Sequence, residues 1–333
     1  MGEAEQRGSG FGIRGSKTLP PNPEPRTPIP VLVAPTASGK TAVATALASL
    51  TDIAIVSADS RQVYRGLDVG TAKPSTGERA AAPYYGLDRV DATERYSAGR
   101  FAREAAAWMA EAREAGRLPV VVGGTGFYVR ALFDGLFEEP PLDGERREAL
   151  KGVLASLEGE ALVRLARRLD PGFRGADRQR AARAAEVALL TGRPLSAWHA
   201  RRPAERSANQ PWYVHLTLPR TELARRIAVR AEAMVAGGII AETERLLAGG
   251  VPRTAPGLSG VGYREVIAFL DGRLPREALA PAIAAATRRY AKRQETWFRH
   301  QLRGPVLTLE ATEAPLVLAK RILAGYRAAC ASA

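Results

Sequence analysis

A phosphate-binding loop is the clearest chemical signal, because Gly-Lys-Thr at residues 39–41 follows a short apolar run and precedes a helix-forming stretch. In such a strand–loop–helix unit, backbone N–H groups at the helix start hold a diphosphate and the lysine adds positive charge. The threonine hydroxyl can bind Mg²⁺. The predicted loop consists of Pro35, Thr36, Ala37, Ser38, Gly39, Lys40 and Thr41. Ala34 replaces the usual first glycine, and alanine fits there only if its φ is negative.

Two further polar segments follow apolar runs. Asp59 comes after residues 53–56, and Thr125 lies within the glycine-rich residues 123–126, after residues 120–122. In open α/β sheets, ligand-handling residues gather at the carboxyl ends of the strands. A carboxylate there could hold a metal or accept a proton, and it could equally cap the next turn. The glycines permit close approach of a ligand, and a simple strand-to-helix turn explains them nearly as well.

The elements that carry these residues alternate between strands and helices. Residues 31–33, 53–56 and 120–122 are predicted as buried parallel strands, with crossover helices over 41–50 and 97–115. Residues 213–218 and 306–309 are expected to join the same sheet. Later helices are predicted over 221–236, 281–302 and 314–328. The predicted fold class is α/β, with a P-loop NTPase-like, mostly parallel sheet flanked by helices.

The sequence predicts four regions. Residues 1–30 are rich in Gly, Pro and charge and are expected to be a disordered leader. Residues 31–137 and 208–315 form the catalytic core, and 316–333 a C-terminal helix and tail. Residues 138–207 are predicted as an inserted all-helical domain with a break at Asp170-Pro171-Gly172. Within this insertion, residues 145–206 hold fourteen Lys or Arg and eight Asp or Glu, a net charge of 14 − 8 = +6.

The overall charge points to a polyanionic partner. The chain has 333 residues and a formal charge of 48 − 35 = +13, with a pI near 10.3. Such an excess favours binding to nucleic acid, although a compositional bias toward Arg could also produce it. No apolar run is long enough to span a bilayer, and no signal peptide is recognisable. The single cysteine, Cys330, excludes a disulfide framework or Cys-based zinc site. We expect a cytoplasmic protein with no membrane association and no protein partner implied.

Together, the motifs resemble the tRNA dimethylallyltransferase family, also called tRNA isopentenyltransferases, in its bacterial form. The resemblance spans about residues 31–303 and keeps the family's order. Its blocks lie at 35–41, 59–62 with Tyr64, 68–74, 123–128, 177–180 with Arg183, Glu186 and 191–192, 261–265 and 293–299.

The resemblance implies transfer of a dimethylallyl group from dimethylallyl diphosphate to N6 of adenosine 37 in the tRNA anticodon loop, with Mg²⁺. The phosphate loop then holds an isoprenoid diphosphate, and Thr41 holds the metal. By resemblance, Asp59 is the general base, Thr125 a second hydrogen-bonding group, and Arg230 a further diphosphate ligand. The family also has a tunnel through the core that admits the base at one end and the isoprenoid at the other.

The resemblance also assigns the contacts to the tRNA anticodon stem-loop. The basic insertion is expected to grasp the stem through its phosphates, and the basic helix 287–299 is similar to a further tRNA-binding stretch. The implied tRNA-binding residues are Asp59, Ser60, Arg61, Gln62, Thr125, Gln179, Arg180, Ala181, Ala182, Arg183, Val261, Gly262, Tyr263 and Arg264.

A few positions differ from the family pattern or are given a structural interpretation. Tyr84 and Tyr85 stand where the family often has two histidines. Arg226 is assigned to a solvated helix face, and the aromatic residues of the last long helix, Tyr290 among them, are assigned to core packing rather than to base stacking.

Two alternatives remain open. A P-loop small-molecule or nucleotide kinase would share Lys40, Thr41 and Mg²⁺, with Asp59 as the base for a hydroxyl acceptor. It leaves the charge of +13 unexplained. The second alternative, a non-catalytic RNA-binding protein, would account for the positive charge but would leave Asp59 and Thr125 without a function.

Overall fold

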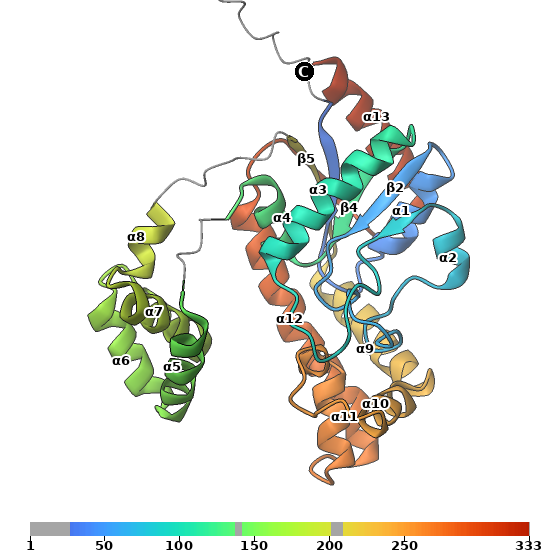
Figure 1. Cartoon of the computed structure of the whole chain (residues 1–333). Helices are drawn as coiled ribbons and strands as arrows, with labels where there is room; N and C mark the ends of the chain where they lie inside the picture. The colour runs from blue at the N-terminus through green and yellow to red at the C-terminus, as the bar shows by residue number, and fades with distance from the viewer. Residues whose placement is uncertain (1–26, 137–141, 201–208, 333) are drawn as a thin grey trace, which may run out of the picture.

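The core is a six-stranded parallel sheet, described by a computed structural model that covers residues 27–136, 142–200 and 209–332 (Figure 1). The strand order is β3-β2-β4-β1-β5-β6, and every neighbouring pair is parallel. The strands are β1 (Ile29–Val33), β2 (Ile53–Ser57), β3 (Tyr84–Tyr85), β4 (Leu118–Gly123), β5 (Pro211–Thr217) and β6 (Val306–Glu310). The predicted α/β class with a parallel sheet is confirmed.

The first strand begins earlier than expected, so Ile29 and Pro30 belong to the sheet rather than to the leader. Proline argues against a central strand because it lacks an N–H group. Here the Ile29 N–H points toward the β5 side and donates to the carbonyl of Gln210, the residue before β5, at 2.8 Å. The nitrogen of Pro30 therefore faces the opposite side, and pairing with β4 begins only at Val31. No ladder hydrogen bond is lost. The rest of the predicted leader, residues 1–26, lies outside the described residues.

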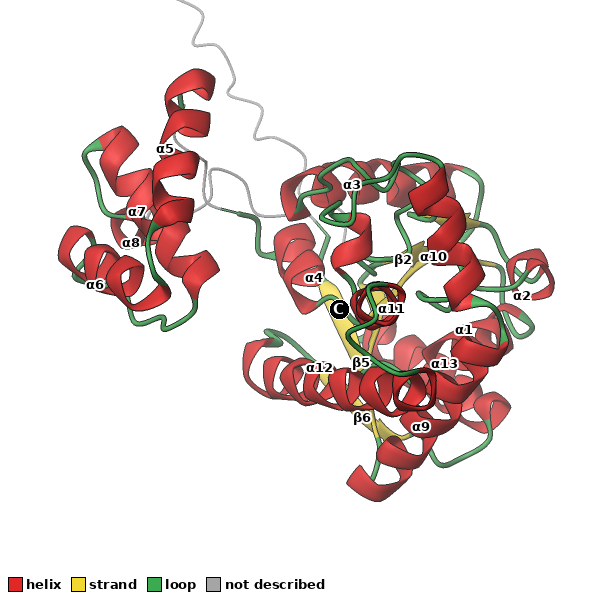
Figure 2. Ribbon diagram, turned by 90° about the horizontal axis from the view of Figure 1, so that it is seen from below, coloured by secondary structure: helices red, strands yellow, loops and turns green. Residues whose placement is uncertain are grey.

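Helices cover both faces of the sheet, and β1, β2 and most of β4 are therefore buried throughout. Among the packed pairs are α3 with α4, α1 with α13, and α9 with α12. Figure 2 shows the long helix α12 alongside α9. The core helices are α1 (Lys40–Ala48), α2 (Thr76–Ala80), α3 (Ala98–Glu114), α4 (Gly126–Phe133), α9 (Arg220–Ala236), α10 (Ile239–Ala248), α11 (Tyr263–Leu270), α12 (Leu279–Gln301) and α13 (Pro315–Ala331), with 3₁₀ turns η1 (Gly257–Ser259) and η2 (Arg276–Ala278).

Four helices between β4 and β5 build a separate cluster beside the sheet (Figure 1). They are α5 (Gly144–Ser156), α6 (Gly159–Leu169), α7 (Arg178–Thr191) and α8 (Leu195–Ala200). Leu154, Leu162 and Ala185 belong to a small hydrophobic core of their own. The break after α6 is held by Asp170, whose carboxylate accepts from the N–H groups of Gly172 at 2.9 Å and Ser196 at 2.8 Å. The two boundaries predicted for this insertion lie outside the described residues.

Two features of the core depart from the sequence analysis. β3 is only two residues long and was not predicted. Helix α13, set apart in the sequence as a tail, packs against α1, β5 and β6, and Leu318 and Ile322 lie in the main core. Within the described parts of the chain, no helix is both long and apolar enough to cross a membrane.

Candidate active site

The predicted phosphate loop connects β1 to α1. Gly39 caps the helix with φ of 92°, and Ala37 has φ of 63°, so the left-handed positions of the loop fall there. Ala34 does not have a positive φ, as its side chain requires, and it is completely buried. The Lys40 ammonium donates to the carbonyls of Ala34 and Pro35, both at 2.9 Å. The Lys40 side chain therefore folds back over the phosphate loop, the same loop that would hold a diphosphate.

Asp59 and Thr125 extend from neighbouring strands and their loops are joined. The Asp59 carboxylate accepts from the Arg61 N–H at 2.8 Å. The Thr125 hydroxyl accepts from the Ser60 N–H at 3.0 Å and lies 3.3 Å from the Ser60 hydroxyl. These bonds hold the two polar segments together at the carboxyl edge of β2 and β4, as the strand order predicts.

Lys40, Asp59 and Arg230 form a charged group beside a small cavity. Burial lowers the pKa of Lys40 to about 8, against the opposing effect of the Asp59 carboxylate and with a further lowering by Arg230. Burial also lowers the pKa of Arg230, and Asp59 again opposes the effect. A cavity of about 40 Å³ is lined by Lys40, Thr41 and Asp59 among others. Two cations and one carboxylate thus meet where the loop ends, and a polyanion would relieve the repulsion between the cations.

The assignment of Arg226 to a solvated face is wrong. Its guanidinium donates to the Ser38 carbonyl of the phosphate loop at 3.3 Å and to the Ala311 carbonyl at 3.0 Å. It also pairs with Glu222 at 2.7 Å. Helical spacing identifies the residues that share a face with Arg226, but not the loop that packs against that face.

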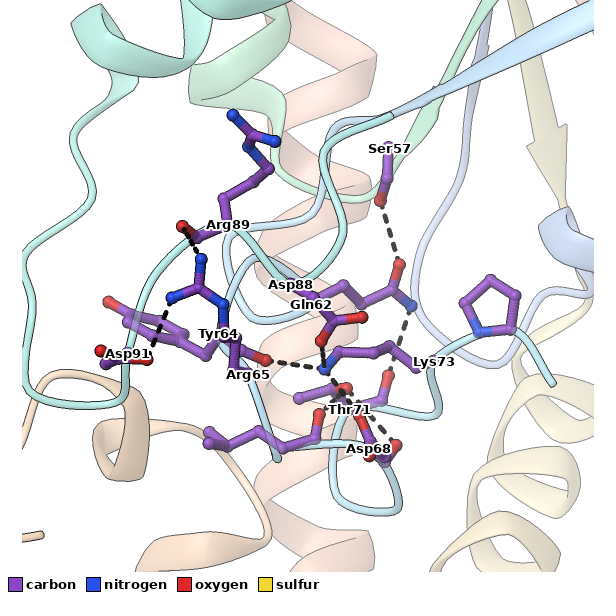
Figure 3. Close-up of polar contacts among 12 residues, drawn as sticks. Ser57, Gln62, Tyr64, Arg65, Asp68, Thr71, Lys73, Asp88, Arg89 and Asp91 are labelled. Atoms are coloured by element: carbon purple, nitrogen blue, oxygen red, sulfur yellow. Dashed lines mark hydrogen bonds and ion pairs between the residues drawn. The ribbon is translucent and has the colours of Figure 1, made fainter. Parts of the chain in front are cut away.

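Arg230 contacts a loop that a polar network holds in position, and Figure 3 shows that network. The Arg230 guanidinium donates to the Thr71 carbonyl at 3.4 Å. The Gln62 side chain accepts from the Ser57 hydroxyl at 3.0 Å and donates to the Ala72 carbonyl at 3.2 Å. Gln62, predicted to contact RNA, therefore bonds within the protein.

Two buried charged side chains, Lys73 and Glu242, stabilise the segment 68–73 that contacts Arg230. Lys73, whose side chain is 1% exposed, donates to the Tyr64 carbonyl at 2.7 Å and to the carboxylates of Asp68 and Asp88 at 2.6 and 2.5 Å (Figure 3). Glu242 accepts three successive backbone N–H groups, at residues 68, 69 and 70, at 2.8 to 3.1 Å. Lys73 lies within a resembling block, whereas nothing in the sequence identified Glu242.

The glycines at the end of β4 and directly after it have a packing role. A Cβ at Gly123 would lie 2.2 Å from the Ala58 carbonyl oxygen, and one at Gly126 would lie 2.2 Å from the Trp297 ring. A Cβ at Gly124 would lie 2.4 Å from the Gln294 amide nitrogen. The chain itself occupies the space that these glycines leave, so close approach of a ligand is not needed to explain them.

Gln294 braces the phosphate loop from α12 and was assigned no role from the sequence. It is buried, accepts from the Thr36 N–H at 2.9 Å, and donates to the Gly124 carbonyl at 2.8 Å. One side-chain amide therefore joins the phosphate loop, the loop of Thr125 and the basic helix.

We expect Gln294→Ala to weaken phosphate binding because the Thr36 N–H and the Gly124 carbonyl both lose their buried partner. The loss should raise the Kd for inorganic diphosphate roughly tenfold, measured by calorimetry. The neighbouring Glu295→Ala, a half-exposed position on the same helix, is the control. Equal affinities for Gln294→Ala and the unmodified chain would contradict the bracing role.

The implied tRNA-binding residues divide into exposed and buried groups. Gln179, Arg180 and Arg264 are exposed, whereas Ala181 and Tyr263 are buried at 0% and 1% exposure. Assignment of the last two side chains to RNA contact is therefore wrong. Ala181 packs in the insertion's core, and the Tyr263 hydroxyl donates to Glu242 at 2.7 Å. Helical periodicity buries every third or fourth residue of a binding segment.

Arg61 also bonds within the protein. Its guanidinium donates to the Pro256 carbonyl and the Ser259 hydroxyl, both at 3.0 Å, and so ties the Asp59 loop to the turn before residue 261. Gly262 is buried as well, and the partly exposed residues of the set include Ser60, Ala182, Arg183 and Val261. Arg180 and Arg183 line a hollow of about 1730 Å³ together with Arg103, Arg130 and Arg303.

Helix α12 presents basic side chains to solvent. Its exposed cations include Arg288, Arg289, Lys292, Arg293 and Arg299. Phe298 is 2% exposed and Trp297 packs against the main core, which confirms core packing for these two aromatics. Tyr290 lies close to Asp59, whose charge adds to burial in raising the tyrosine pKa to about 12.

The donor set suits a metal ion held mainly through a substrate. Among the described residues, no group of three or more His, Cys, Asp or Glu side chains could hold an ion. Thr41 and Asp59 nevertheless line the same cavity. Mg²⁺ commonly uses one or two protein oxygens together with phosphate oxygens and water, so these two residues fit such an ion.

Comparison with known proteins identifies the family. The IPP transferase family model matches residues 62–301, and the isopentenyl transferase model matches residues 28–95. The chain is 42% identical over 295 residues to a tRNA dimethylallyltransferase of Halorhodospira halophila, covering 85% of this chain and 93% of the relative. It is 43% identical over 278 residues to one from Bradyrhizobium sp., covering 82% and 90%.

A solved structure supports the same relationship. The tRNA isopentenylpyrophosphate transferase of Bacillus halodurans has a TM-score of 0.68 and 30% identity, covering 92% of this chain and 99% of its own. A eukaryotic dimethylallyltransferase acting on tRNA shares the fold at a TM-score of 0.73 and 23% identity, covering 86% of this chain and 74% of its own. These relatives favour a prenyltransferase over the kinase alternative. The chain belongs to the tRNA dimethylallyltransferase family.

Proposed function

We propose that this enzyme transfers a dimethylallyl group from dimethylallyl diphosphate to N6 of the adenosine at tRNA position 37, beside the anticodon, and releases diphosphate. The observation that carries the proposal is that Lys40, Thr41 and Asp59 line one cavity at the phosphate loop, with Arg230 close enough for its charge to lower the pKa of Lys40. The cations suit a diphosphate, and the carboxylate suits an amine that must lose a proton. The exposed basic faces of α7 and α12 suit an RNA partner.

In the proposed reaction, N6 attacks C1 of the dimethylallyl group while the C1–O bond breaks, and the electron pair leaves with the diphosphate. The cations of Lys40 and Arg230 and the N–H groups of the phosphate loop stabilise the departing charge. The exocyclic amine is a weak nucleophile, because its lone pair is delocalised into the purine. Asp59 accepts the proton from N6, and Thr125 orients the amine by a hydrogen bond.

Mg²⁺ is the proposed cofactor, and when bound it neutralises charge on the leaving diphosphate. Thr41 would hold it through the side-chain hydroxyl, with Asp59 nearby. The Lys40 ammonium, which donates to the carbonyls of Ala34 and Pro35, lies at the loop that would hold the diphosphate.

The tRNA is proposed to bind across the hollow between the insertion and the core. The target adenine must leave the anticodon-loop stack to reach Asp59. Arg180 and Arg183 are then placed to contact stem phosphates, while Arg264 and the exposed cations of α12 approach the loop. The proposal places the enzyme in the cytoplasm with its tRNA substrate.

Transfer of labelled dimethylallyl diphosphate to undermodified bulk tRNA, with Mg²⁺ present, tests the function. We expect label in acid-precipitable tRNA, and loss of that label when the adenosine at position 37 is replaced in a transcribed anticodon stem-loop. ATP turnover without labelling of tRNA would contradict the proposal and favour a kinase.

A further inference from the structure

Tyr84 lies on the phosphate-loop side of the sheet. It pairs with Ile55 in the parallel ladder between β3 and β2. Side chains of paired residues share a face, and residues two apart on one strand do so as well. Ile55, Ser57 and Tyr84 therefore face the same way, and all three line the cavity that also contains Lys40 and Thr41.

The next residue, Tyr85, faces the opposite side. Tyr85 pairs with Val56 in the ladder, and its ring stacks on Trp108 of α3 with ring centroids 6.2 Å apart. Its hydroxyl donates a hydrogen bond to the Glu111 carboxylate at 2.9 Å. The hydroxyl of Tyr85 is thus satisfied by α3. The pair of tyrosines forms a natural comparison, because the two side chains have the same chemistry and opposite orientations.

The Tyr84 hydroxyl is buried, and the side chain close enough to share a hydrogen bond with it is that of Thr45, one helical turn after Thr41. Neither hydroxyl has any other partner among the described residues. Burial raises the pKa of Tyr84 to about 12, so the phenol stays protonated and can donate at neutral pH. Two hydroxyls that face each other share at most one hydrogen bond, so one buried O–H donor is left over, and it costs free energy unless something completes it.

We propose that the Tyr84 hydroxyl donates a hydrogen bond to an anionic oxygen of the diphosphate, as a further binding group of this site. The inference rests on the proposed function and deepens it. Lys40, Thr41 and Tyr84 line one small cavity, the first two from α1 and the third from β3. A neutral donor adds stabilisation of the leaving group without adding to the repulsion between Lys40 and Arg230.

Binding of inorganic diphosphate in the presence of Mg²⁺, measured by calorimetry on the full chain, tests the proposal. We expect Tyr84→Phe to raise the Kd about tenfold, the effect of losing one hydrogen bond to a charged group. Tyr85→Phe, which removes the hydroxyl on the opposite face, should stay within about twofold of the unmodified chain. Tyr84→His restores a donor at this position and should recover most of the affinity.

Each other outcome has a distinct meaning. Tyr84→Phe with unchanged diphosphate affinity would overturn the inference and assign the hydroxyl to Thr45 alone. Equal weakening in Tyr84→Phe and Tyr85→Phe would overturn it too, because the loss would then come from the packing of β3. If the unmodified chain fails to bind diphosphate, the proposed function itself fails, and the inference fails with it.

Discussion

Replacing Asp59 by asparagine is expected to lower kcat for prenylation of tRNA by about 10²- to 10⁴-fold, the usual contribution of a positioned general base. Asparagine keeps an oxygen that can accept from the Arg61 N–H, now at 2.8 Å, so the loop after β2 should retain its shape. What disappears is the proton acceptor and the negative charge between Lys40 and Arg230. The measurement is single-turnover transfer of labelled dimethylallyl diphosphate to a tRNA transcript.

The same variant should bind tRNA with nearly unchanged affinity, measured by filter binding, because the residues proposed to contact the anticodon stem-loop lie on the insertion and on α12. Asp52→Asn, which removes an exposed carboxylate 3.4 Å from Arg117, is the matched control and should leave kcat unaltered. If Asp59→Asn turns over at the rate of the unmodified chain, the carboxylate is not the base. Loss of tRNA binding with turnover preserved at saturating tRNA would assign Asp59 to recognition instead.

The sheet and the phosphate loop could be predicted because their signals are local. Short apolar runs ending in glycine or polar residues identify buried parallel strands, and Gly-Lys-Thr after the first run identifies the loop. The meeting of Asp59 and Thr125 also followed, since both lie after strands that end at one edge of the sheet. The Ser60 N–H donates to the Thr125 hydroxyl across 65 residues of sequence, at 3.0 Å.

The remaining parts depend on packing between segments far apart in sequence. Arg226 reaches the phosphate loop across 188 residues, and Gln294 reaches it across 258. A helical pattern shows that such residues share a face, but not what that face meets. Glu242 had no motif at all, yet it holds three backbone N–H groups of the loop that places Arg230. The residues that support the site were therefore harder to predict than the residues that act in it.

Lys40→Met is expected to reduce kcat/KM for dimethylallyl diphosphate by about 10²- to 10³-fold, since a partly buried cation at a leaving group is worth several kcal/mol. The affinity of the unmodified chain for diphosphate ligands should depend on pH. The Lys40 pKa is lowered from 10.5 to about 8, and a bound anion raises it again. Diphosphate binding therefore takes up a proton above pH 8, and the Kd for a non-reactive dimethylallyl diphosphate analogue should increase about tenfold per pH unit there. Lys40→Met should lack this dependence.

The effect of the same substitution on stability has the opposite sign. Because the Lys40 pKa is lower in the folded chain, the unfolded chain binds more protons between about pH 8 and 10.5, and stability rises with pH across that window. Below pH 8 both states are protonated and the full cost of the buried charge remains. Lys40→Met should therefore be more stable than the unmodified chain at pH 7, by at most about 3 kcal/mol, with the advantage shrinking toward pH 10.5. Urea unfolding at pH 7 and pH 10 measures both values. A variant less stable at pH 7 would mean that the ammonium's bonds to Ala34 and Pro35 outweigh the cost of its burial, and that Lys40 holds the phosphate loop in place.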